Sequence, residues 1–322
     1  MIIWCNAQFT GGPLRELNEG VGQHRLIHSA LASASNLVAG AHDPAMEEAD
    51  IAFGQPDPTG VVRCEGLRWV HITSAGYTRY DTPEFRSALT ARGAVFTNSS
   101  QVYAEPCAEH ALAFMMAQAR QLPQCIGTQL GDHSWPTPER RIASRLMTGQ
   151  SVLMLGFGAI GRRLTELLAP FQMQITAMRR TSSVEAGIRI ITEDSLIPAL
   201  AEADHVVNIL PESPATRGLI EARAFAAMKP GAVFYNIGRG TTVDQTALIG
   251  ALQSGRLAAA YLDVTDPEPL PPSHPLWTTP NCFITPHTAG GHDTEQHSLV
   301  RHFLRNLELF DAGKPLIDRV IG

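Results

Sequence analysis

The stretch SVLMLGFGAIGRR, residues 151–163, places Gly156, Gly158 and Gly161 between an apolar run and an amphipathic one. In a strand-turn-helix unit the first such glycine permits a tight turn, the second lets a pyrophosphate approach the backbone, and the third lets helix and strand pack closely. The flanking patterns make this motif more specific than its glycines alone, and it predicts a dinucleotide site. The alternative is a turn that needs glycines for steric reasons only. Contacts are expected from the whole turn: Gly156, Phe157, Gly158, Ala159, Ile160 and Gly161.

A second polar cluster ends the next apolar run, ITAMRRTSS, and includes Arg179, Arg180 and Thr181. An acidic residue at this strand end commonly accepts hydrogen bonds from the ribose of NAD, and this strand end has none. A carboxylate beside a 2′-phosphate would cost about 1 to 4 kcal/mol per charge pair, whereas a guanidinium gives charge-assisted bonds. We therefore expect no carboxylate in this pocket and a preference for NADP(H), with NAD(H) possible. The alternative is a solvated arginine pair on the surface.

Histidines recur at every fifth position after residue 286, at His287, His292, His297 and His302. A step of five residues on a helix turns about 140° beyond a full circle, so these side chains would not share a face. The five cysteines show no CxxC spacing, and no cluster completes a zinc shell. We expect no metal site and no disulfide framework.

These residues need elements that position them, and the sequence pattern indicates α/β structure. From residue 1 to about 98, short apolar runs such as MIIWC, ADIAFG and LRWVHITSAG alternate with amphipathic segments, which is typical of an open parallel sheet. A long apolar helix is expected from about Glu105 to near Pro123, followed by an irregular arm. The alternation then resumes, and a final helical segment ends at Gly313.

Composition limits the possible partners. Of the 322 residues, 44% are hydrophobic and 17% are charged, a composition that is typical of a folded protein. The net charge is −6, which disfavours a nucleic-acid partner. The opening MIIWCNAQFT has no basic leader and too short an apolar run for a membrane span. We therefore expect a cytoplasmic protein without a membrane partner.

Three further motifs, NIGRGTTVDQTAL, AAAYLDVTDPEPLPPSHPLW and NCFITPHTAGG, follow the glycine turn in order. In order and approximate spacing they resemble the D-isomer-specific 2-hydroxyacid dehydrogenases, in particular the glyoxylate/hydroxypyruvate reductase branch. The resemblance covers most of the chain, because AEPCAEHALAFMMAQAR before the glycine turn also matches. It implies two α/β domains. A Rossmann-type, doubly wound parallel sheet would span residues 99–289, and a discontinuous flavodoxin-like substrate domain would span 1–98 and 290–322, with the active site in the cleft between them.

The resemblance also implies roles for individual residues. Arg239 in NIGRG matches the arginine that holds the substrate carboxylate and C2 oxygen, Glu268 in DPEPL matches the acid paired with the catalytic histidine, and His287 matches that histidine. Ala75 and Gly76 in TSAGY match a loop whose amides hold the carboxylate. The remaining matches lie beside the cofactor, together with His287: Leu210, Pro211, Ile237, Gly238 and Asp263.

The implied chemistry fits these residue types. Hydride transfer to C2 of a 2-keto acid leaves charge on its oxygen, which must be protonated in step. A carboxylate beside a histidine favours the charged imidazole, so Glu268 would keep His287 protonated. Arg239 stays cationic and offers a planar fork for carboxylate and keto oxygen. Taken singly, each of the three has a structural alternative as a loop or turn residue.

The loop TSAGYTRYD departs from the family pattern at residues 77–80, which leaves the substrate open. Arg79 there could meet a second anionic group, and the alternative we favour is exposure to water. Trp135 and Trp277 could line the site or pack at an interface. The resemblance implies a homodimer that uses an arm at about residues 135–145.

The resulting prediction is an oxidoreductase that reduces glyoxylate or hydroxypyruvate with NADPH. One alternative is an NAD-dependent dehydrogenase of a larger D-2-hydroxy acid. The other is a dinucleotide-sensing protein similar to the corepressors that resemble this family.

Overall fold

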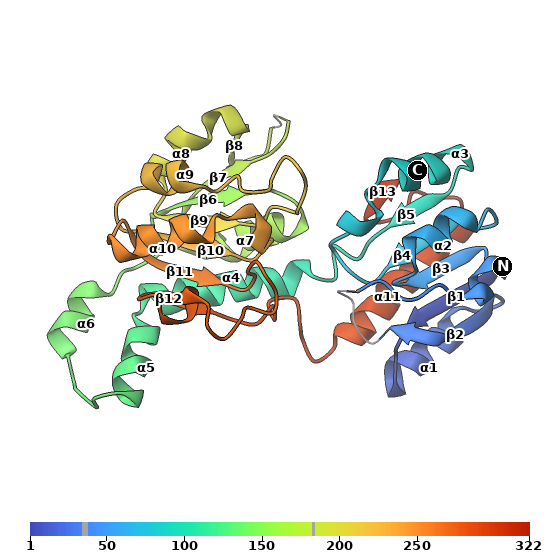
Figure 1. The fold of residues 1–322 in the computed structure, drawn as a ribbon, viewed down its shortest axis with the longest axis horizontal. Coiled ribbons are helices and arrows are strands. Elements are labelled where there is room, and N and C mark those ends of the chain that lie inside the picture. The colour runs from blue at the N-terminus through green and yellow to red at the C-terminus, as the bar shows by residue number, and fades with distance from the viewer. Residues whose placement is uncertain (34–37, 182–183) are drawn as a thin grey trace. The chain divides into compact units, whose positions relative to one another are not determined.

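The computed structural model describes residues 1–33, 38–181 and 184–322 (Figure 1). The chain divides into two compact units: unit 1 comprises Met1–Tyr103 and Gly291–Gly322, and unit 2 comprises Ala104–Gly290. Ser182 and Ser183, which end the arginine cluster, lie outside the described residues. The assignment of substrate and dinucleotide roles to residues 1–98 with 290–322 and to 99–289 stays a prediction.

Unit 1 is built on one sheet, whose described strands run in the order β13-β5-β4-β3-β1-β2. All neighbours are parallel except the pair of β13 and β5. The strands are β1 (Ile2–Ala7), β2 (Arg25–Ser33), β3 (Ile51–Gly54), β4 (Trp69–Ile72), β5 (Val95–Thr97) and β13 (Arg319–Ile321). The helices are α1 (Gly11–Gly20), α2 (Pro58–Arg63), α3 (Pro83–Ala91) and α11 (Glu295–Asp311), with short 3₁₀ turns η1 (Pro44–Glu48) and η2 (Thr78–Tyr80).

The core of unit 1 explains why the final helix belongs to it. Phe303 of α11 stacks on Phe53 of β3 with ring centroids 4.0 Å apart, and on Trp69 of β4 at 5.2 Å. The helix also packs on α1. Its apolar stripe therefore packs on one face of a sheet whose strands, except β13, come from the first hundred residues.

Unit 2 contains a parallel sheet with the described order β12-β11-β10-β9-β6-β7-β8. The strands are β6 (Ser151–Leu155), β7 (Gln174–Met178), β8 (Arg189–Ile191), β9 (His205–Asn208), β10 (Ala232–Asn236), β11 (Leu257–Leu262) and β12 (Cys282–Ile284). The helices are α4 (Ala104–Ala119), α5 (Leu122–Leu130), α6 (Thr137–Ala143), α7 (Ala159–Leu168), α8 (Leu196–Glu202), α9 (Ala222–Ala227) and α10 (Gln245–Gln253). Short 3₁₀ turns are η3 (Ala169–Phe171), η4 (Glu193–Ser195), η5 (Gly240–Thr242) and η6 (Pro275–Thr278). The strand order is that of a doubly wound sheet, so the predicted α/β fold class is confirmed.

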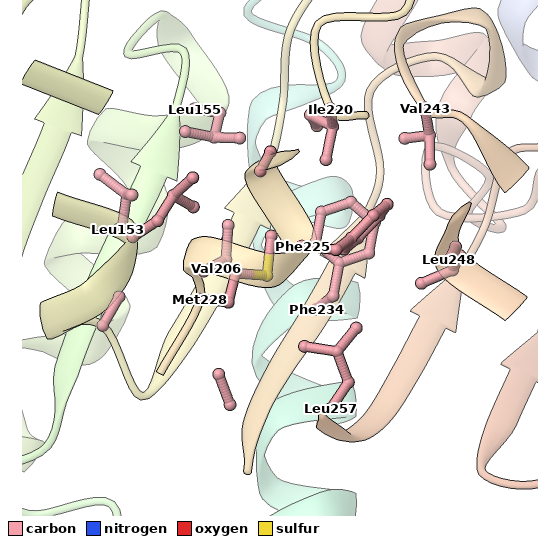
Figure 2. Packing of buried hydrophobic residues seen from close by; sticks show 14 of the residues in the cluster. Leu153, Leu155, Val206, Ile220, Phe225, Met228, Phe234, Val243, Leu248 and Leu257 are labelled. Carbon is pink, nitrogen blue, oxygen red and sulfur yellow. The ribbon is translucent and has the colours of Figure 1, made fainter. Parts of the chain in front are cut away.

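The central strands of unit 2 are buried on both faces, which is why their sequences are nearly continuous apolar runs. Figure 2 shows part of the core, where Phe225 of α9 meets Phe234 of β10 edge to face with centroids 5.5 Å apart. Helix α9 packs on both α8 and α10, whereas α4 packs on α7. This core fixes the carboxyl ends of the strands, where the predicted site residues lie.

The long apolar helix ends earlier than the sequence predicts. α4 stops at Ala119 because Gln121 adopts a left-handed backbone with φ 57°, and α5 begins at Leu122. The expected irregular arm contains the short helix α6, and none of the side chains of α5 or α6 is buried. Among the described residues, the helices are too short or too polar to span a bilayer.

Candidate active site

The glycine turn follows β6 at the point where the strand order reverses, between β6 and β9. Gly156 has φ +99°, and a Cβ there would lie 3.3 Å from the carbonyl group of Ile209. A Cβ at Gly158 would meet no described atom within 4 Å, so this residue leaves the backbone open to a ligand. A Cβ at Gly161 would lie 3.1 Å from the Phe157 ring, so helix and turn pack closely there. The turn therefore has the three steric properties that a pyrophosphate site needs.

The first turn of α7 adds an electrostatic property to this open backbone. The helix begins at Ala159, and among the described residues no side chain caps its N-terminus at Gly158. The first amides of a helix have no partner within it and carry partial positive charge. The turn and the start of α7 could therefore hold the pyrophosphate of a dinucleotide.

The loops after β9, β10 and β11 pack backbone against backbone. A Cβ at Gly238 would lie 2.7 Å from the carbonyl oxygen of Leu210, so the loop after β10 lies against the residues that include Pro211. A Cβ at Gly240 would lie 2.0 Å from both carbonyl atoms of Thr265. These two glycines bring Ile237 to Arg239 beside the loop that carries Glu268.

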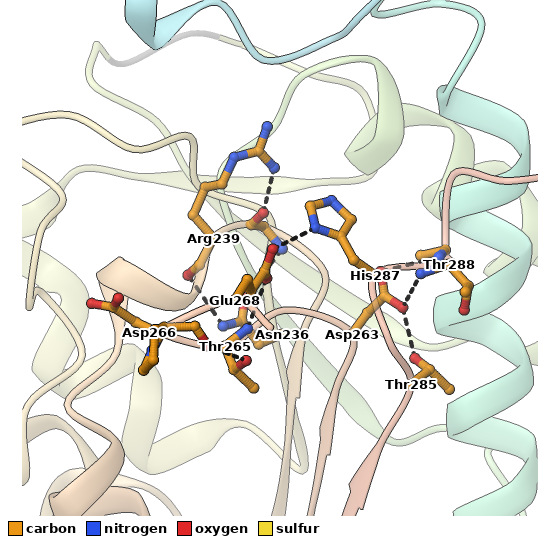
Figure 3. Close-up of polar contacts among 12 residues, drawn as sticks. Asn236, Arg239, Asp263, Thr265, Asp266, Glu268, Thr285, His287 and Thr288 are labelled. Carbon is orange, nitrogen blue, oxygen red and sulfur yellow. Dashed lines mark hydrogen bonds and ion pairs between the residues drawn. The ribbon is translucent and has the colours of Figure 1, made fainter. Parts of the chain in front are cut away.

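His287 and Glu268 form the central contact of the site, shown in Figure 3. The Nδ1 atom of His287 lies 2.8 Å from Oε2 of Glu268, and the other carboxylate oxygen accepts from the Thr265 amide at 3.0 Å. Burial raises the pKa of Glu268, but the hydrogen bonds from His287 and Thr265, with Arg239 nearby, outweigh it and hold that pKa below its usual range. The carboxylate is therefore ionised near neutral pH, so Nδ1 donates to it and Nε2 is left for proton exchange.

His287 has an unusual backbone. Its φ is 53°, in the left-handed region, and its amide donates to the Asp263 carbonyl at 2.9 Å and to the Thr285 carbonyl at 3.0 Å. Non-glycine residues adopt this conformation at a cost and only where neighbours hold them. The imidazole is thus aimed by the backbone as well as by Glu268.

Arg239 follows β10, and Figure 3 shows its guanidinium pointing to the same side as the His287 imidazole. Its Nη1 donates to the Gly238 carbonyl at 2.6 Å. Its own carbonyl accepts from the side chains of Asn236 at 3.2 Å and Thr242 at 2.7 Å. The structure therefore brings Arg239, Glu268 and His287 together within unit 2.

Asp263 anchors the turn that carries His287. One carboxylate oxygen accepts from the Thr285 hydroxyl at 2.6 Å and the Thr288 amide at 2.8 Å, and the other accepts from the Ala289 amide at 3.0 Å. Its side chain is 2% exposed. Asp263 thus connects the end of β11 to the residues that follow β12.

Sequence reasoning missed His110, which lies on α4. Its Nε2 atom is 3.1 Å from the Thr285 hydroxyl and 3.7 Å from Asp263. Because the Thr285 hydroxyl donates to Asp263, it accepts from His110. Burial lowers the pKa of His110 and the nearby Asp263 raises it, with a net shift below the usual value. Its signal in the sequence was a histidine inside the apolar run AEHALAF.

The expectation that no carboxylate lies near the arginine cluster is wrong. Oε1 of Glu185 accepts from Nη1 of Arg179 at 3.2 Å, and the same carboxylate accepts two hydrogen bonds from Arg162. Arg180 and Thr181 are exposed. The carboxylate escaped notice because it follows the strand end by seven residues instead of occupying it.

Ala75 and Gly76 lie in unit 1, in the loop after β4. The Asn98 side chain donates to the Ala75 carbonyl at 2.7 Å, and the Ser74 hydroxyl donates to the Gly76 carbonyl at 2.8 Å. These bonds fix the peptide planes of the loop. The arrangement of this loop relative to the unit 2 residues is a prediction.

The divergent segment 77–80 is partly a core element. Tyr80 is fully buried and donates to the Pro56 carbonyl at 2.9 Å, and Tyr77 lies edge-on to Phe96. Arg79 is half-buried, whereas the alternative favoured by the sequence was exposure to water. Trp135 is 92% exposed and Trp277 is 47% exposed.

The regularly spaced histidines do not converge. Among the described residues, no group of three or more His, Cys, Asp or Glu side chains is placed to hold a metal ion. The four have four different partners: Glu268 for His287, Thr294 for His292, Glu16 for His297 and Asp318 for His302.

Comparison with known proteins adds to this geometry. The profile of the family described as "D-isomer specific 2-hydroxyacid dehydrogenase, NAD binding domain" matches residues 112–289. An uncharacterized protein of the proB 3′ region of Corynebacterium melassecola is 37% identical over 264 residues, which are 80% of this chain and 83% of that protein. The glyoxylate reductase/hydroxypyruvate reductase of Homo sapiens is 33% identical over 231 residues, which are 71% of this chain and 70% of that protein.

A solved structure is similar over nearly the whole chain. The D-isomer specific 2-hydroxyacid dehydrogenase from Xanthobacter autotrophicus Py2, in complex with NADPH and MES, has a TM-score of 0.79 and 28% identity. The match covers 99% of this chain and 97% of that chain.

Proposed function

Because this chain belongs to the family of D-isomer specific 2-hydroxyacid dehydrogenases, oxidoreductases that act on CH–OH groups with NAD(P), we propose that it reduces a small 2-keto acid with NADPH. The family predicted from the sequence is confirmed, as is a nicotinamide dinucleotide as cofactor. Glyoxylate and hydroxypyruvate are the proposed substrates, and the name of the human relative supports them. The observation that carries the proposal is the 2.8 Å contact of His287 with Glu268 on the side to which Arg239 points.

His287 is the proposed proton donor. The reduced nicotinamide, when bound, supplies the hydride that reaches C2 of the keto acid. Nε2 of His287 then gives its proton to the C2 oxygen, and in the reverse reaction it accepts that proton. Glu268 stabilises the imidazolium through Nδ1, and the bonds to the backbone amide of His287 keep the ring aimed.

Arg239 is the proposed binding group for the substrate carboxylate and the keto oxygen. Its guanidinium is charged at every working pH, and its planar fork suits two oxygens at once. The cation stabilises the charge that develops on the C2 oxygen before proton transfer. The amides of Ala75 and Gly76 are proposed to hold the same carboxylate from unit 1.

A turnover assay with glyoxylate and hydroxypyruvate tests the enzymatic proposal. The wild type should oxidise NADPH with at least one of them, and His287→Ala should lose turnover while binding NADPH as the wild type does. His42→Ala is the matched control, because this exposed histidine lies 3.9 Å from Glu47 in unit 1. No turnover by the wild type would contradict the proposal and favour a dinucleotide-sensing protein.

The NADPH preference is proposed from the cations at the end of β7. Arg179 lies where the ribose of a dinucleotide is bound in this fold, and Arg162 lies in the first turn of α7. NADPH is also the cofactor in the related Xanthobacter autotrophicus structure. The ratio of kcat/KM for NADPH to that for NADH should exceed one in the wild type and fall below one in Arg179→Asp.

A homodimer formed through the arm is proposed from an exposed apolar surface on unit 2, which we call the arm surface. Its residues are 49% to 92% exposed. Exposed apolar patches of this kind commonly mark protein–protein interaction sites, which supports an interface here. The arm surface consists of Leu122, Ile126, Leu130, Trp135, Ile142 and Leu146.

The oligomeric state tests this part of the proposal. The wild type should have the mass of two chains in light scattering after gel filtration, and a Leu130→Ser, Trp135→Ser double variant should shift to one. Val184→Ser is the control, because that residue is fully exposed outside the arm surface. A monomeric wild type would contradict the proposal.

A further inference from the structure

Three charged side chains meet beside the glycine turn of unit 2. Arg162 donates to both oxygens of Glu185, through Nη1 at 2.9 Å and Nη2 at 2.7 Å, and Nη1 of Arg179 adds a third bond at 3.2 Å. Arg162 follows Gly161, Arg179 follows β7, and Glu185 lies in a turn closed by its backbone bridge to Ile188. The cluster thus joins three separate segments at the carboxyl edge of the sheet.

The position of the cluster is that of the cofactor ribose. In a doubly wound sheet the pyrophosphate lies on the turn after the first strand, and the ribose lies at the end of the second, here β7. An acid at that strand end usually binds the ribose hydroxyls, whereas an arginine accommodates a 2′-phosphate. In this chain both kinds of group are present, and the acid is engaged by the arginines.

The geometry of the three bonds is that of an anion bound by two cations. A bidentate bond from one guanidinium and a third from another is the arrangement with which arginines hold a phosphate. Hydrogen bonds and charge from Arg162 hold the pKa of Glu185 below its usual range, so the carboxylate is an anion near neutral pH. The side chains of Arg162, Arg179 and Glu185 are 48%, 31% and 21% exposed, so an incoming anion can reach them.

We propose that the Glu185 carboxylate is an internal competitor for the 2′-phosphate of NADP(H) and must leave Arg162 and Arg179 when that phosphate binds. The inference rests on the proposed NADPH preference and adds two specificity-determining residues, Arg162 and Glu185, to Arg179. Two guanidinium groups balance a phosphate dianion, and a carboxylate left between them would repel it. The ion pairs of Glu185 are exposed and therefore weak, so replacement of its carboxylate by the more highly charged 2′-phosphate is favourable. NADH, with a hydroxyl at this place, would leave the ion pair intact.

The test uses the full chain and probes that need no catalysis. Binding of 2′,5′-ADP and of 5′-ADP is measured by calorimetry for the wild type, Glu185→Gln and Arg162→Gln. Glu185→Gln should bind 2′,5′-ADP about tenfold more tightly, because one like charge is removed from contact distance, and should bind 5′-ADP within about twofold of the wild type. Arg162→Gln should weaken 2′,5′-ADP by about tenfold and leave 5′-ADP unchanged.

Glu202→Gln is the matched control. It breaks the exposed ion pair between Glu202 and Arg189, whose atoms are 2.6 Å apart in the same unit, and it should change neither affinity. Thermal unfolding of each variant shows that the fold is retained.

The outcomes separate this inference from the proposed NADPH preference. If the wild type prefers 2′,5′-ADP and Glu185→Gln binds it no more tightly, the competitor role is overturned while the preference stands. If the wild type shows no preference but Glu185→Gln does, the preference fails while the competitor role is supported. A loss of 5′-ADP affinity in Glu185→Gln would identify Glu185 as a ribose ligand and overturn the inference.

Discussion

Gly240→Ala tests whether close backbone packing positions the acid and the cation of the site. Gly240 directly follows Arg239, and a Cβ on it would lie 2.0 Å from the carbonyl carbon and oxygen of Thr265 and 2.6 Å from the Asp266 amide. These atoms belong to the backbone of the loop that carries Glu268. Neither a rotamer change nor a flexible side chain can therefore relieve the clash.

The magnitude follows from these distances. Real Cβ atoms do not come closer than 3.0 Å to another heavy atom, and this Cβ would lie 2.0 Å from Thr265. The loops after β10 and β11 must therefore move apart by at least 1.0 Å. A misplacement of about 1 Å in a catalytic group can cost about a hundredfold in rate. Overpacking of a well-packed region also lowers the free energy of unfolding by about 1 to 3 kcal/mol. We expect kcat to fall about a hundredfold while the cofactor still binds at the glycine turn.

The assay compares kcat for keto-acid reduction, NADPH affinity and thermal unfolding in Gly240→Ala and Gly250→Ala. Gly250 lies on α10, and a Cβ there would meet no atom within 4 Å of the described chain. The control should keep its kcat and gain up to about 1 kcal/mol of stability from helix propensity. A folded Gly240→Ala protein with kcat within about twofold of the wild type would refute the packing argument.

Three other substitutions test individual contacts in the two units. Glu268→Gln removes the carboxylate that accepts from Nδ1 of His287 and fixes its ring, so kcat for keto-acid reduction should fall about ten- to a hundredfold; a kcat within about twofold of the wild type would contradict this role. Asp43 is buried, which raises its pKa, but bonds from Ser29, Trp4 and the Ala45 amide hold that pKa below its usual range. Its stabilisation is therefore present above the unfolded pKa of about 3.9 and lost as pH falls through the folded value. Chemical denaturation of Asp43→Asn should show a deficit of about 1 to 3 kcal/mol at pH 7 that shrinks toward pH 3, and a constant deficit would count against it. Gly158→Ala should weaken NADPH binding about tenfold, or about 1.4 kcal/mol, in fluorescence titration without lowering Tm, and unchanged binding would argue against pyrophosphate contact there.

The order of apolar runs was sufficient to predict the central strands of both sheets. β3, β4, β9 and β10 are buried on both faces, so their sequences carry a continuous apolar signal. Three of the four edge strands, β2, β8 and β13, were not predicted, because these strands have fewer buried side chains and more polar sequences; the fourth, β12, was predicted from the apolar run NCFIT. The exact end of α4 also escaped prediction, since it depends on the left-handed backbone of Gln121.

The glycine turn could be predicted because it is a local feature. Its strand, turn and helix follow one another within residues 151–168, and the steric rules for such a turn involve only neighbouring residues. The resemblance then supplied candidate roles for Arg239, Glu268 and His287, which the structure places together in unit 2. Their orientation depends on contacts that no spacing encodes, such as the bonds of Asp263 to the turn at 285–289.

Only the tertiary structure decided what surrounds the predicted residues. The chain alone shows arginines at the end of β7, but the fold carries Glu185 back onto Arg179 and Arg162, the latter 23 positions earlier. It likewise brings His110 of α4 to Thr285, 175 positions away. The sequence determines the intrinsic charge and the steric freedom of each residue. The partner that each side chain binds, and with it the orientation of that side chain, is decided by packing between distant segments.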